Sequence, residues 1–323
     1  RSPRRADAAV EKGGNQKGFY GRGAVVASGL AKQGGVMKRF LIAVLVSGLT
    51  VVAFASTHVS KGALGVSGET KASSLSGLCL DGDGNIVTAD QGGKCLRVIT
   101  PDDKLKAVWK LDFAPEAVSW RAADRAVLVA GSGRVAVLDA RGQVKVSSEL
   151  PQASKTATAV SASGDDVFVT VRANTGYAVF RLDSNLANPK RILSGLRGCC
   201  GQMDVMAYGD TVYVAANCNF EVGMYDREGK KKGAITKPKG AAYFDGCCEP
   251  KNVCMGSDGA LYVAESGRCA VHRFSTDGKH LGEVGVVKDI GGCVRVTVAV
   301  SQDCSRVYML DTVKNIVRVL VKK

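Results

Sequence analysis

Cysteine is the residue type in this chain whose number and spacing point to chemistry. The sequence contains 11 cysteines among 323 residues. Cys200, Cys248 and Cys293 each stand five residues before a short apolar run, and Cys199 and Cys247 directly precede the first two of them. Cysteine sulfurs form disulfides and bind soft metal ions. The repeated position therefore predicts that these five residues gather at one place in the fold.

Three interpretations of these cysteines are open. One is disulfide bonding, either from a Cys-Cys pair to the neighbouring unit or within the pair. The second form would be strained, because consecutive Cα atoms lie about 3.8 Å apart and disulfides usually need about 4.4–6.8 Å. Another interpretation is a thiolate site for zinc or copper. An iron–sulfur cluster is less favoured, because Met37-Lys-Arg-Phe is not a twin-arginine signal for export of a loaded protein. The third is free thiols.

A longer repeat predicts the structural setting of the cysteines. Between Gly246 and Gly285, four short apolar runs alternate with turns rich in Gly, Asp and Ser. Six such units follow residue 72, at a spacing of about forty residues that is typical of β-propeller blades. We therefore predict an all-β, six-bladed β-propeller with four-stranded antiparallel blades over residues 73–323. The apolar runs of the clearest unit are Val253–Met255, Leu261–Ala264, Ala270–Phe274 and His280–Val284.

The last unit ends after its third strand, at Lys323. An unpaired outer edge would leave backbone N–H and C=O groups without partners. We expect the N-terminal segment 56–72, in particular Lys61–Ser67, to supply the missing strand and close the ring.

The repeat motif also carries a family resemblance. Asp258-Gly-x-Leu-Tyr-Val-Ala-Glu265, followed by Val271-His-Arg-Phe-x-x-Asp-Gly-Lys279, resembles NHL repeats. The resemblance covers roughly residues 73–323. With Gly-Cys-Cys at the start of some blades, the chain is similar to exported bacterial NHL-repeat proteins, especially those of planctomycetes. This resemblance implies a fold and no particular activity.

In a propeller, the connection from one blade to the next and the loop between the second and third strands lie at the same end of the ring, beside the central channel. We call it the cysteine end, because the alignment brings up to eight thiols there. Cys79 and Cys254 align on inner strands and are expected in the core, and Cys304 at a turn. The eight are Cys95, Cys199, Cys200, Cys218, Cys247, Cys248, Cys269 and Cys293.

Polar residues align at the same end. Asp90, Glu265 and Asp311 close the second strand of their units, and Asp204 and Asn252 stand at the start of inner strands. Gluconolactonase-like six-bladed proteins hold a metal, often calcium, with such groups, so calcium is a candidate. The competing interpretation is that these side chains cap loops through backbone amides. Lys251 and Arg295 would give the channel a positive potential suited to an anionic or thiol-reactive ligand.

The first part of the chain has a different character. From Met37, a basic pair and an apolar run that ends at Ala55 have the pattern of a secretory signal peptide over residues 37–55. Residues 1–36 are interpreted as an upstream extension. The run is shorter than the about 20 residues of a comfortable membrane span, although a signal anchor is the alternative. We predict a periplasmic or extracellular protein without a stable membrane span after cleavage.

The charge argues against nucleic acid as a partner. Half of the formal net charge of +14 lies in residues 1–55, which hold nine Lys/Arg and two Asp/Glu. The remaining excess of +7 is dispersed rather than interleaved with aromatic residues. No histidine is placed to serve a nucleophile. We expect an exported, non-catalytic propeller that binds a small molecule or a protein through its cysteine end. The alternatives are a metal- or thiol-dependent enzyme or redox protein that uses the same cysteines, and a purely structural module.

Overall fold

The computed structural model describes residues 55–66, 68–151, 156–246, 248–287, 290 and 292–323. Cys247, the extension 1–36 and residues 37–54 of the predicted signal peptide lie outside these residues. No helix in the described part of the chain is long and apolar enough to cross a membrane. The only helical elements there are two 3₁₀ turns, η1 (Gly68–Thr70) and η2 (Ala122–Asp124).

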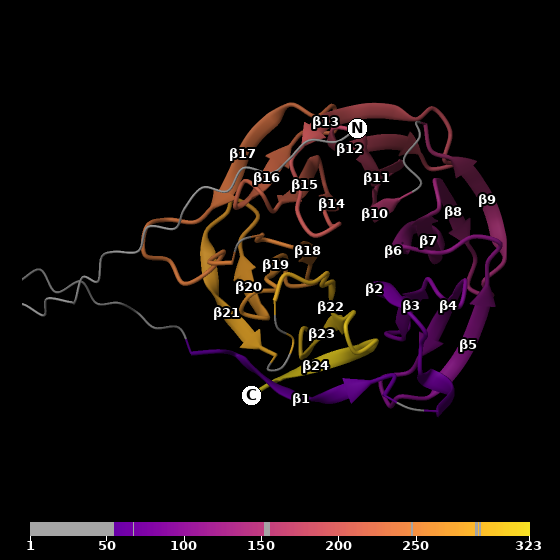
Figure 1. Ribbon diagram of the computed structural model, residues 1–323, viewed down its shortest axis with the longest axis horizontal. Coiled ribbons are helices and arrows are strands. Elements are labelled where there is room, and N and C mark those ends of the chain that lie inside the picture. The colour runs from indigo at the N-terminus through magenta and orange to yellow at the C-terminus, as the bar shows by residue number, and fades with distance from the viewer. Residues whose placement is uncertain (1–54, 67, 152–155, 247, 288–289, 291) are drawn as a thin grey trace, which may run out of the picture. The chain divides into compact units, whose positions relative to one another are not determined.

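Twenty-four strands form six four-stranded antiparallel sheets arranged as a ring, which confirms the predicted six-bladed β-propeller (Figure 1). Blade 1 contains β2 (Leu75–Leu80), β3 (Ile86–Asp90), β4 (Cys95–Ile99) and β5 (Leu105–Lys110). Blade 2 contains β6 (Ala117–Arg121), β7 (Ala126–Gly131), β8 (Arg134–Leu138) and β9 (Val144–Glu149). Blade 3 contains β10 (Ala157–Ser163), β11 (Asp166–Ala173), β12 (Gly176–Asp183) and β13 (Lys190–Leu196).

The second half of the ring repeats this order. Blade 4 contains β14 (Asp204–Tyr208), β15 (Thr211–Ala216), β16 (Glu221–Tyr225) and β17 (Lys231–Thr236). Blade 5 contains β18 (Asn252–Met255), β19 (Leu261–Ala264), β20 (Ala270–Phe274) and β21 (His280–Val286). Blade 6 contains β22 (Val298–Val300), β23 (Arg306–Asp311), β24 (Ile316–Lys322) and, as its outer strand, β1 (His58–Leu64).

The strand that completes blade 6 comes from the opposite end of the described chain. β1 pairs antiparallel with β24, with Val59 opposite Val321 and a bulge between Ser60 and Ala63. It overlaps the expected segment but begins three residues earlier. Leu64 enters a core cluster with residues of blades 1 and 6, so this strand covers the edge of β24 and contributes to the core.

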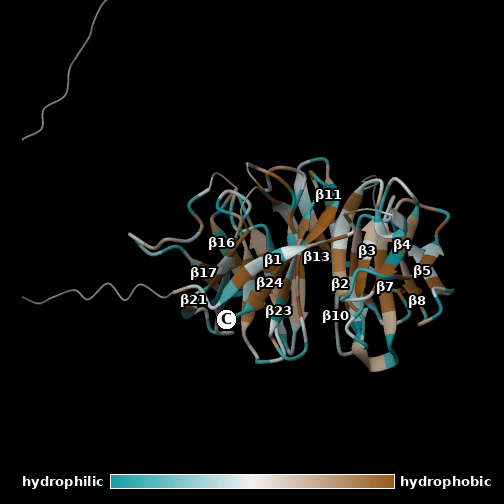
Figure 2. Cartoon of the chain, turned by 90° about the horizontal axis from the view of Figure 1, so that it is seen from below, coloured by the Kyte–Doolittle hydropathy of each residue, from teal (hydrophilic) through white to brown (hydrophobic). Residues whose placement is uncertain are grey.

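The core lies between adjacent blades because each sheet is covered on both faces. β7, in the middle of blade 2, is buried at every position. Its Leu128 and the Val160 and Phe180 of blade 3 belong to one cluster. Continuous Val-rich strands suit a sheet of this kind. Figure 2 accordingly shows predominantly apolar strands, with polar loops at the two ends of the ring.

Short turns fix the spacing of the outer strands. The Asp139 carboxylate accepts hydrogen bonds from the amides of Arg141 and Gln143. Gly142 has a φ of +77°, and a Cβ at this position would overlap the ring of Trp109 on blade 1. The turn therefore requires glycine for its backbone conformation and for close packing.

Candidate functional site

Connections between consecutive blades place the cysteines at one end of the channel. Cys199 and Cys200 lie between β13 and β14, Cys248 between β17 and β18, and Cys293 between β21 and β22. Asn217 holds the first of these connections. Its Oδ1 accepts a hydrogen bond from the Cys199 amide at 2.8 Å. Its Nδ2 donates to the carbonyl of Gln202, in the same turn, at 2.8 Å.

Four sulfurs meet at this place and form what we call the four-cysteine cluster: Cys199, Cys200, Cys248 and Cys293. Their Sγ atoms all lie within 4.8 Å of one another. Cys200 Sγ is 3.2 Å from that of Cys199 and 3.7 Å from that of Cys248. This donor set could bind a metal ion with affinity for sulfur.

One disulfide is present among the described residues, between Cys200 and Cys293, with 6.4 Å between their Cα atoms. Disulfide formation was predicted, but both expected pairings are wrong for Cys200. The bond joins the starts of blades 4 and 6, not of neighbouring blades, and it does not close the Cys199–Cys200 pair. The connections converge on the channel, so the sulfurs of blades 4 and 6 meet across the start of blade 5.

A buried cation lies beside the four-cysteine cluster. Lys251 is 0% exposed, and its Nζ is 3.7 Å from Cys293 Sγ. In the described part of the chain, Lys251 makes no ion pair with a carboxylate. A buried ammonium group is unfavourable without an anionic or strongly accepting neighbour. Cys293 Sγ carries no charge in the disulfide, so Lys251 would gain an anionic sulfur partner only after reduction of the bond to thiolates.

The structure brings together four of the eight cysteines expected at this end. Cys218 lies near this cluster, since Cys199 interacts electrostatically with its thiol. Burial raises the pKa of the Cys218 thiol. Cys95 is buried beside Asp90 in blade 1, and Cys269 donates to the carbonyls of Ser266 in blade 5 and Ile290 in the connection to blade 6. These two residues come from loops of the second and third strands, which lie farther from the axis.

The aligned acidic residues act within their own blades. Asp90 contacts Arg97 at 3.0 Å, Asp311 contacts Arg318 at 3.1 Å, and Glu265 lies 3.4 Å from His272. Each pair is seven residues apart, so blade 5 carries histidine where the other two carry arginine. His272 is buried, and desolvation lowers its pKa to about 3, while burial raises the pKa of Glu265 to about 7.

Backbone amides also bind these carboxylates. Asp90 accepts from Ser74 and Gly93, Asp311 from Val313 and Lys314, and Glu265 from Phe244. Loop capping therefore accounts for all three. Among the described residues, they do not form a shared group of oxygen ligands for calcium.

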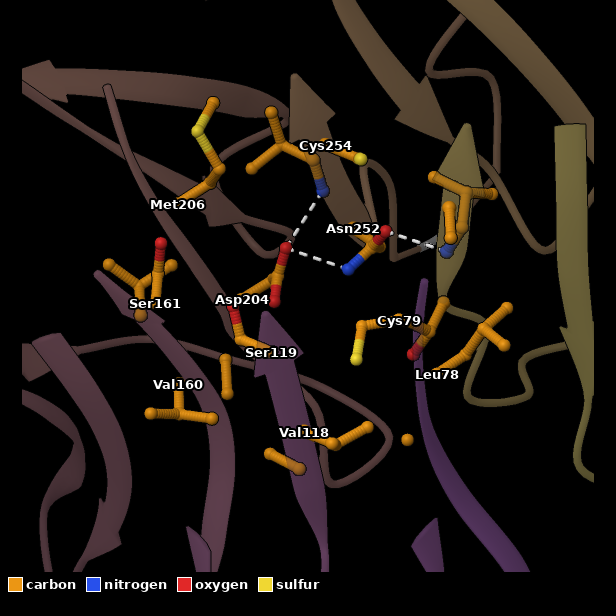
Figure 3. Close-up of a pocket in the computed structure, with 18 of the residues that line it drawn as sticks. Leu78, Cys79, Val118, Ser119, Val160, Ser161, Asp204, Met206, Asn252 and Cys254 are labelled. Atoms are coloured by element: carbon orange, nitrogen blue, oxygen red, sulfur yellow. Dashed lines mark hydrogen bonds between the residues drawn. The ribbon is translucent and has the colours of Figure 1, made fainter. Parts of the chain in front are cut away.

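The inner strands enclose a cavity of about 290 Å³ along the channel. In it, Asp204 Oδ2 accepts hydrogen bonds at 2.8 Å from Asn252 Nδ2 and the Val253 amide, and Asn252 Oδ1 accepts from the Val298 amide (Figure 3). Asp204 and Asn252 thus link blades 4, 5 and 6. Burial raises the pKa of Asp204 to about 7. Cys79 and Cys254 also line this cavity and are half-buried, so the expectation that they lie in the core is only partly met.

Two side chains cross the channel at its cysteine end. Arg295 extends from blade 6, and its Nη2 donates to the carbonyls of Glu116 at 2.7 Å and Thr158 at 2.8 Å. Gln202, before blade 4, exchanges two hydrogen bonds with the backbone of Val296, at 2.6 and 3.1 Å. Arg295 was predicted at the channel mouth, whereas no sequence pattern pointed to Gln202. The role of Gln202 depends on the width of the channel, which no local sequence motif encodes.

The opposite end of the channel is more open. Inner strands begin with buried residues and end with half-buried ones. Leu80, Trp120 and Met255 are examples at the ends of β2, β6 and β18. Residues at this end of the inner strands are therefore more exposed than those at the cysteine end.

Comparison with known proteins supports the fold. The solved structures that the chain resembles include a streptogramin B lyase, with 13% identity and a TM-score of 0.60 over 82% of this chain and 98% of that one. A calcium-binding regucalcin from Agrobacterium tumefaciens has 14% identity and a TM-score of 0.59 over 83% of this chain and 96% of that one. A gluconolactonase from Xanthomonas campestris has 15% identity and a TM-score of 0.58 over 78% of this chain and 87% of that one. No protein-family model and no curated protein matches the chain. The NHL resemblance therefore stays a prediction, and these neighbours show the six-bladed fold alone.

Proposed function

We propose that this protein is a binding propeller that holds one thiophilic metal ion, zinc or copper(I), in the four-cysteine cluster. The observation that carries the proposal is the approach of four sulfurs from three successive blades to within 4.8 Å. Zinc–sulfur bonds of about 2.3 Å in a tetrahedron place the sulfurs about 3.8 Å apart. The 3.7 Å between Cys200 and Cys248 fits that spacing.

Binding requires the reduced cluster. The Cys200–Cys293 disulfide occupies two of the four ligands. Two equivalents of a thiol reductant supply the two electrons that open it, giving two protein thiols and one molecule of oxidised reductant. Metal binding would displace the thiol protons of the ligands into solvent. Lys251, 3.7 Å from Cys293, offsets part of the resulting negative charge.

The donor set supports binding rather than catalysis. Four protein ligands complete a tetrahedral site, whereas catalytic zinc keeps a position open for water or substrate. Calcium, which the name of the regucalcin neighbour suggests, prefers oxygen ligands and does not suit four sulfurs. An exported location agrees with the oxidised form of the cluster, because disulfides are typical of oxidising compartments, whereas the metal-bound form requires the thiol reductant.

The test is elemental analysis and metal titration of the reduced protein. After reduction without oxygen and removal of adventitious metal, we expect one equivalent of zinc or copper(I) per chain. Cys248→Ser and Cys199→Ser should each lose it. Cys304→Ser, a half-buried cysteine on a turn beside Ser257, is the matched control and should keep it. The same stoichiometry in all four proteins, or none in any, would contradict the proposal.

The Cys200–Cys293 disulfide favours a second candidate function, a disulfide-braced propeller that binds a partner without metal. This candidate predicts no metal uptake by the reduced protein and loss of stability on reduction. Thiol counts before and after reduction, made on the same samples, separate it from the metal site.

A further inference from the structure

The two ends of the ring differ in charge. Among the described residues, the turns away from the cysteines hold thirteen Asp or Glu and six Lys or Arg, whereas the loops and connections at the cysteine end hold six and nine. Arg125 and Arg227 at the acidic end are paired with carboxylates. Backbone amides hold the pKa of Asp139 there below its usual range, so this turn stays negative. The ring is therefore a dipole whose positive end carries the cysteines.

Exposed lysines and valines gather at this positive end, where blade 6 meets blade 1. The segment between β1 and β2 lies between two loops and contacts both. The Ser74 carbonyl accepts a hydrogen bond from the Gln91 amide at 2.8 Å, and Asn315 Oδ1 accepts one from the Leu75 amide at 2.9 Å. The segment and the two loops supply five exposed residues that we call the basic patch: Val66, Lys71, Lys94, Val313 and Lys314.

The basic patch combines uncompensated charge with apolar side chains. Its three lysines make no ion pair with a described residue, and the segment between β1 and β2 holds one exposed carboxylate, Glu69. Val313 and Val66 are 64% and 54% exposed. Isolated exposed valines need no explanation, but apolar tips among unpaired lysines have the character of a membrane-surface site. Lysines there approach lipid phosphates while apolar side chains enter the headgroup boundary.

A second contact point lies across the ring, on blade 4 (Figure 1). Phe220, in the loop between β15 and β16, is 43% exposed and has a φ of +56°. Bulky residues rarely adopt this left-handed conformation, and the equivalent loop position of blade 6 holds Asn315, with the same φ. The exposed Arg197 lies near this loop, since it interacts electrostatically with the Cys218 thiol. Two separated contact points would set the ring end flat on a surface.

We propose that the cysteine end docks flat on a bilayer that contains anionic phospholipid, with the basic patch and Phe220 in the headgroup region. A protein interface has a contiguous apolar core, whereas the channel and the exposed Cys200–Cys293 disulfide separate Phe220 from the two valines of the patch. A fluid bilayer accommodates such separate tips, and it repels the acidic end, which faces water. Docking does not require metal in the four-cysteine cluster.

Vesicle co-sedimentation tests docking with residues 56–323, which contain every strand of the six blades and exclude the predicted signal peptide. We expect saturable binding to an equal mixture of phosphatidylglycerol and phosphatidylcholine, and little binding to phosphatidylcholine alone. Binding should be lost in about 1 M NaCl, where the Debye length is about 3 Å. Lys94→Glu/Lys314→Glu should weaken it at least about 25-fold, or about fivefold for each cation removed. Lys104→Glu/Lys279→Glu, on exposed turns of the acidic end, changes the net charge equally and should bind like the parent.

A tryptophan at each end identifies the end that meets lipid. Brominated phospholipid in the same vesicles should quench Phe220→Trp but not Tyr208→Trp, which lies 50% exposed beside a turn of the acidic end. Trp109 and Trp120 are common to both variants, and thermal unfolding identifies any variant that has lost the fold. The proposal is overturned by no binding, by equal binding to both vesicle types, by equal loss in the two lysine variants or by equal quenching at the two ends. Binding to soluble polyglutamate as tight as to vesicles would favour an acidic protein instead and would also overturn it.

Discussion

Reduction of the Cys200–Cys293 disulfide should lower the free energy of unfolding by several kcal/mol. The bond joins residues 93 positions apart. In the chain-entropy treatment, a closed loop of this length removes about 4.6 kcal/mol of conformational freedom from the unfolded state at 25 °C. Residual structure in the unfolded chain reduces this value. We therefore expect a loss of about 3–4 kcal/mol.

Urea unfolding at equilibrium measures the effect. The experiment compares oxidised and reduced protein in a chelator, so that metal does not replace the bond, and fluorescence and circular dichroism should give coincident transitions. With a slope of about 3 kcal/mol/M, the midpoint should fall by about 1 M. The double variant Cys200→Ala/Cys293→Ala should match the reduced protein, whereas Cys304→Ser should not differ from the parent. Addition of zinc at 100 times its Kd should restore about 2.7 kcal/mol to the reduced parent.

Two outcomes would refute this reasoning. If reduction releases two thiols and the midpoint does not move, the bond does not constrain the unfolded chain. If the double variant is much more stable than the reduced parent, the effect of reduction comes from another cysteine pair.

Three further predictions concern the channel, the ring closure and the loops. Because burial raises the pKa of Asp204 to about 7, above its usual value of about 3.9, the stability it contributes is complete below about pH 4 and is lost as the pH rises through 7. Asp204→Asn keeps an acceptor for Asn252 and Val253 but does not titrate. The free energy of unfolding of this variant minus that of the parent should therefore rise by about 2 kcal/mol between pH 5 and pH 8 in urea unfolding. A difference that stays constant over this pH range would contradict the raised pKa of Asp204. Leu64→Ala, in the closing strand β1, should cost about 2–3 kcal/mol by removing a buried side chain, whereas the exposed control Val66→Ala should cost less than about 0.5 kcal/mol. Asp90→Ala leaves Arg97 and the part-buried amides of Ser74 and Gly93 without an acceptor and should lower the free energy of unfolding by about 3–5 kcal/mol. Asp112→Ala, in an exposed ion pair, should cost about 1 kcal/mol or less. Equal losses for the two variants in urea unfolding would argue against loop capping.

The sequence by itself determined the strands and their repetition. The run Leu261–Ala264 coincides with β19, and His280–Val284 lies within β21. Such agreement is expected, because alternating apolar runs and glycine turns act on the local backbone. The alignment of cysteines on equivalent connections is also local, since it follows from counting residues to the next inner strand.

Only the tertiary structure decided which of these residues meet. Cys200 bonds Cys293 rather than a neighbour in the chain, Lys251 is buried against a sulfur, and Arg295 spans the channel to blades 2 and 3. These contacts depend on the number of blades and the width of the ring. Both arise from the packing of whole sheets against each other, so a repeat of about forty residues specifies the blade but not the distances across its axis.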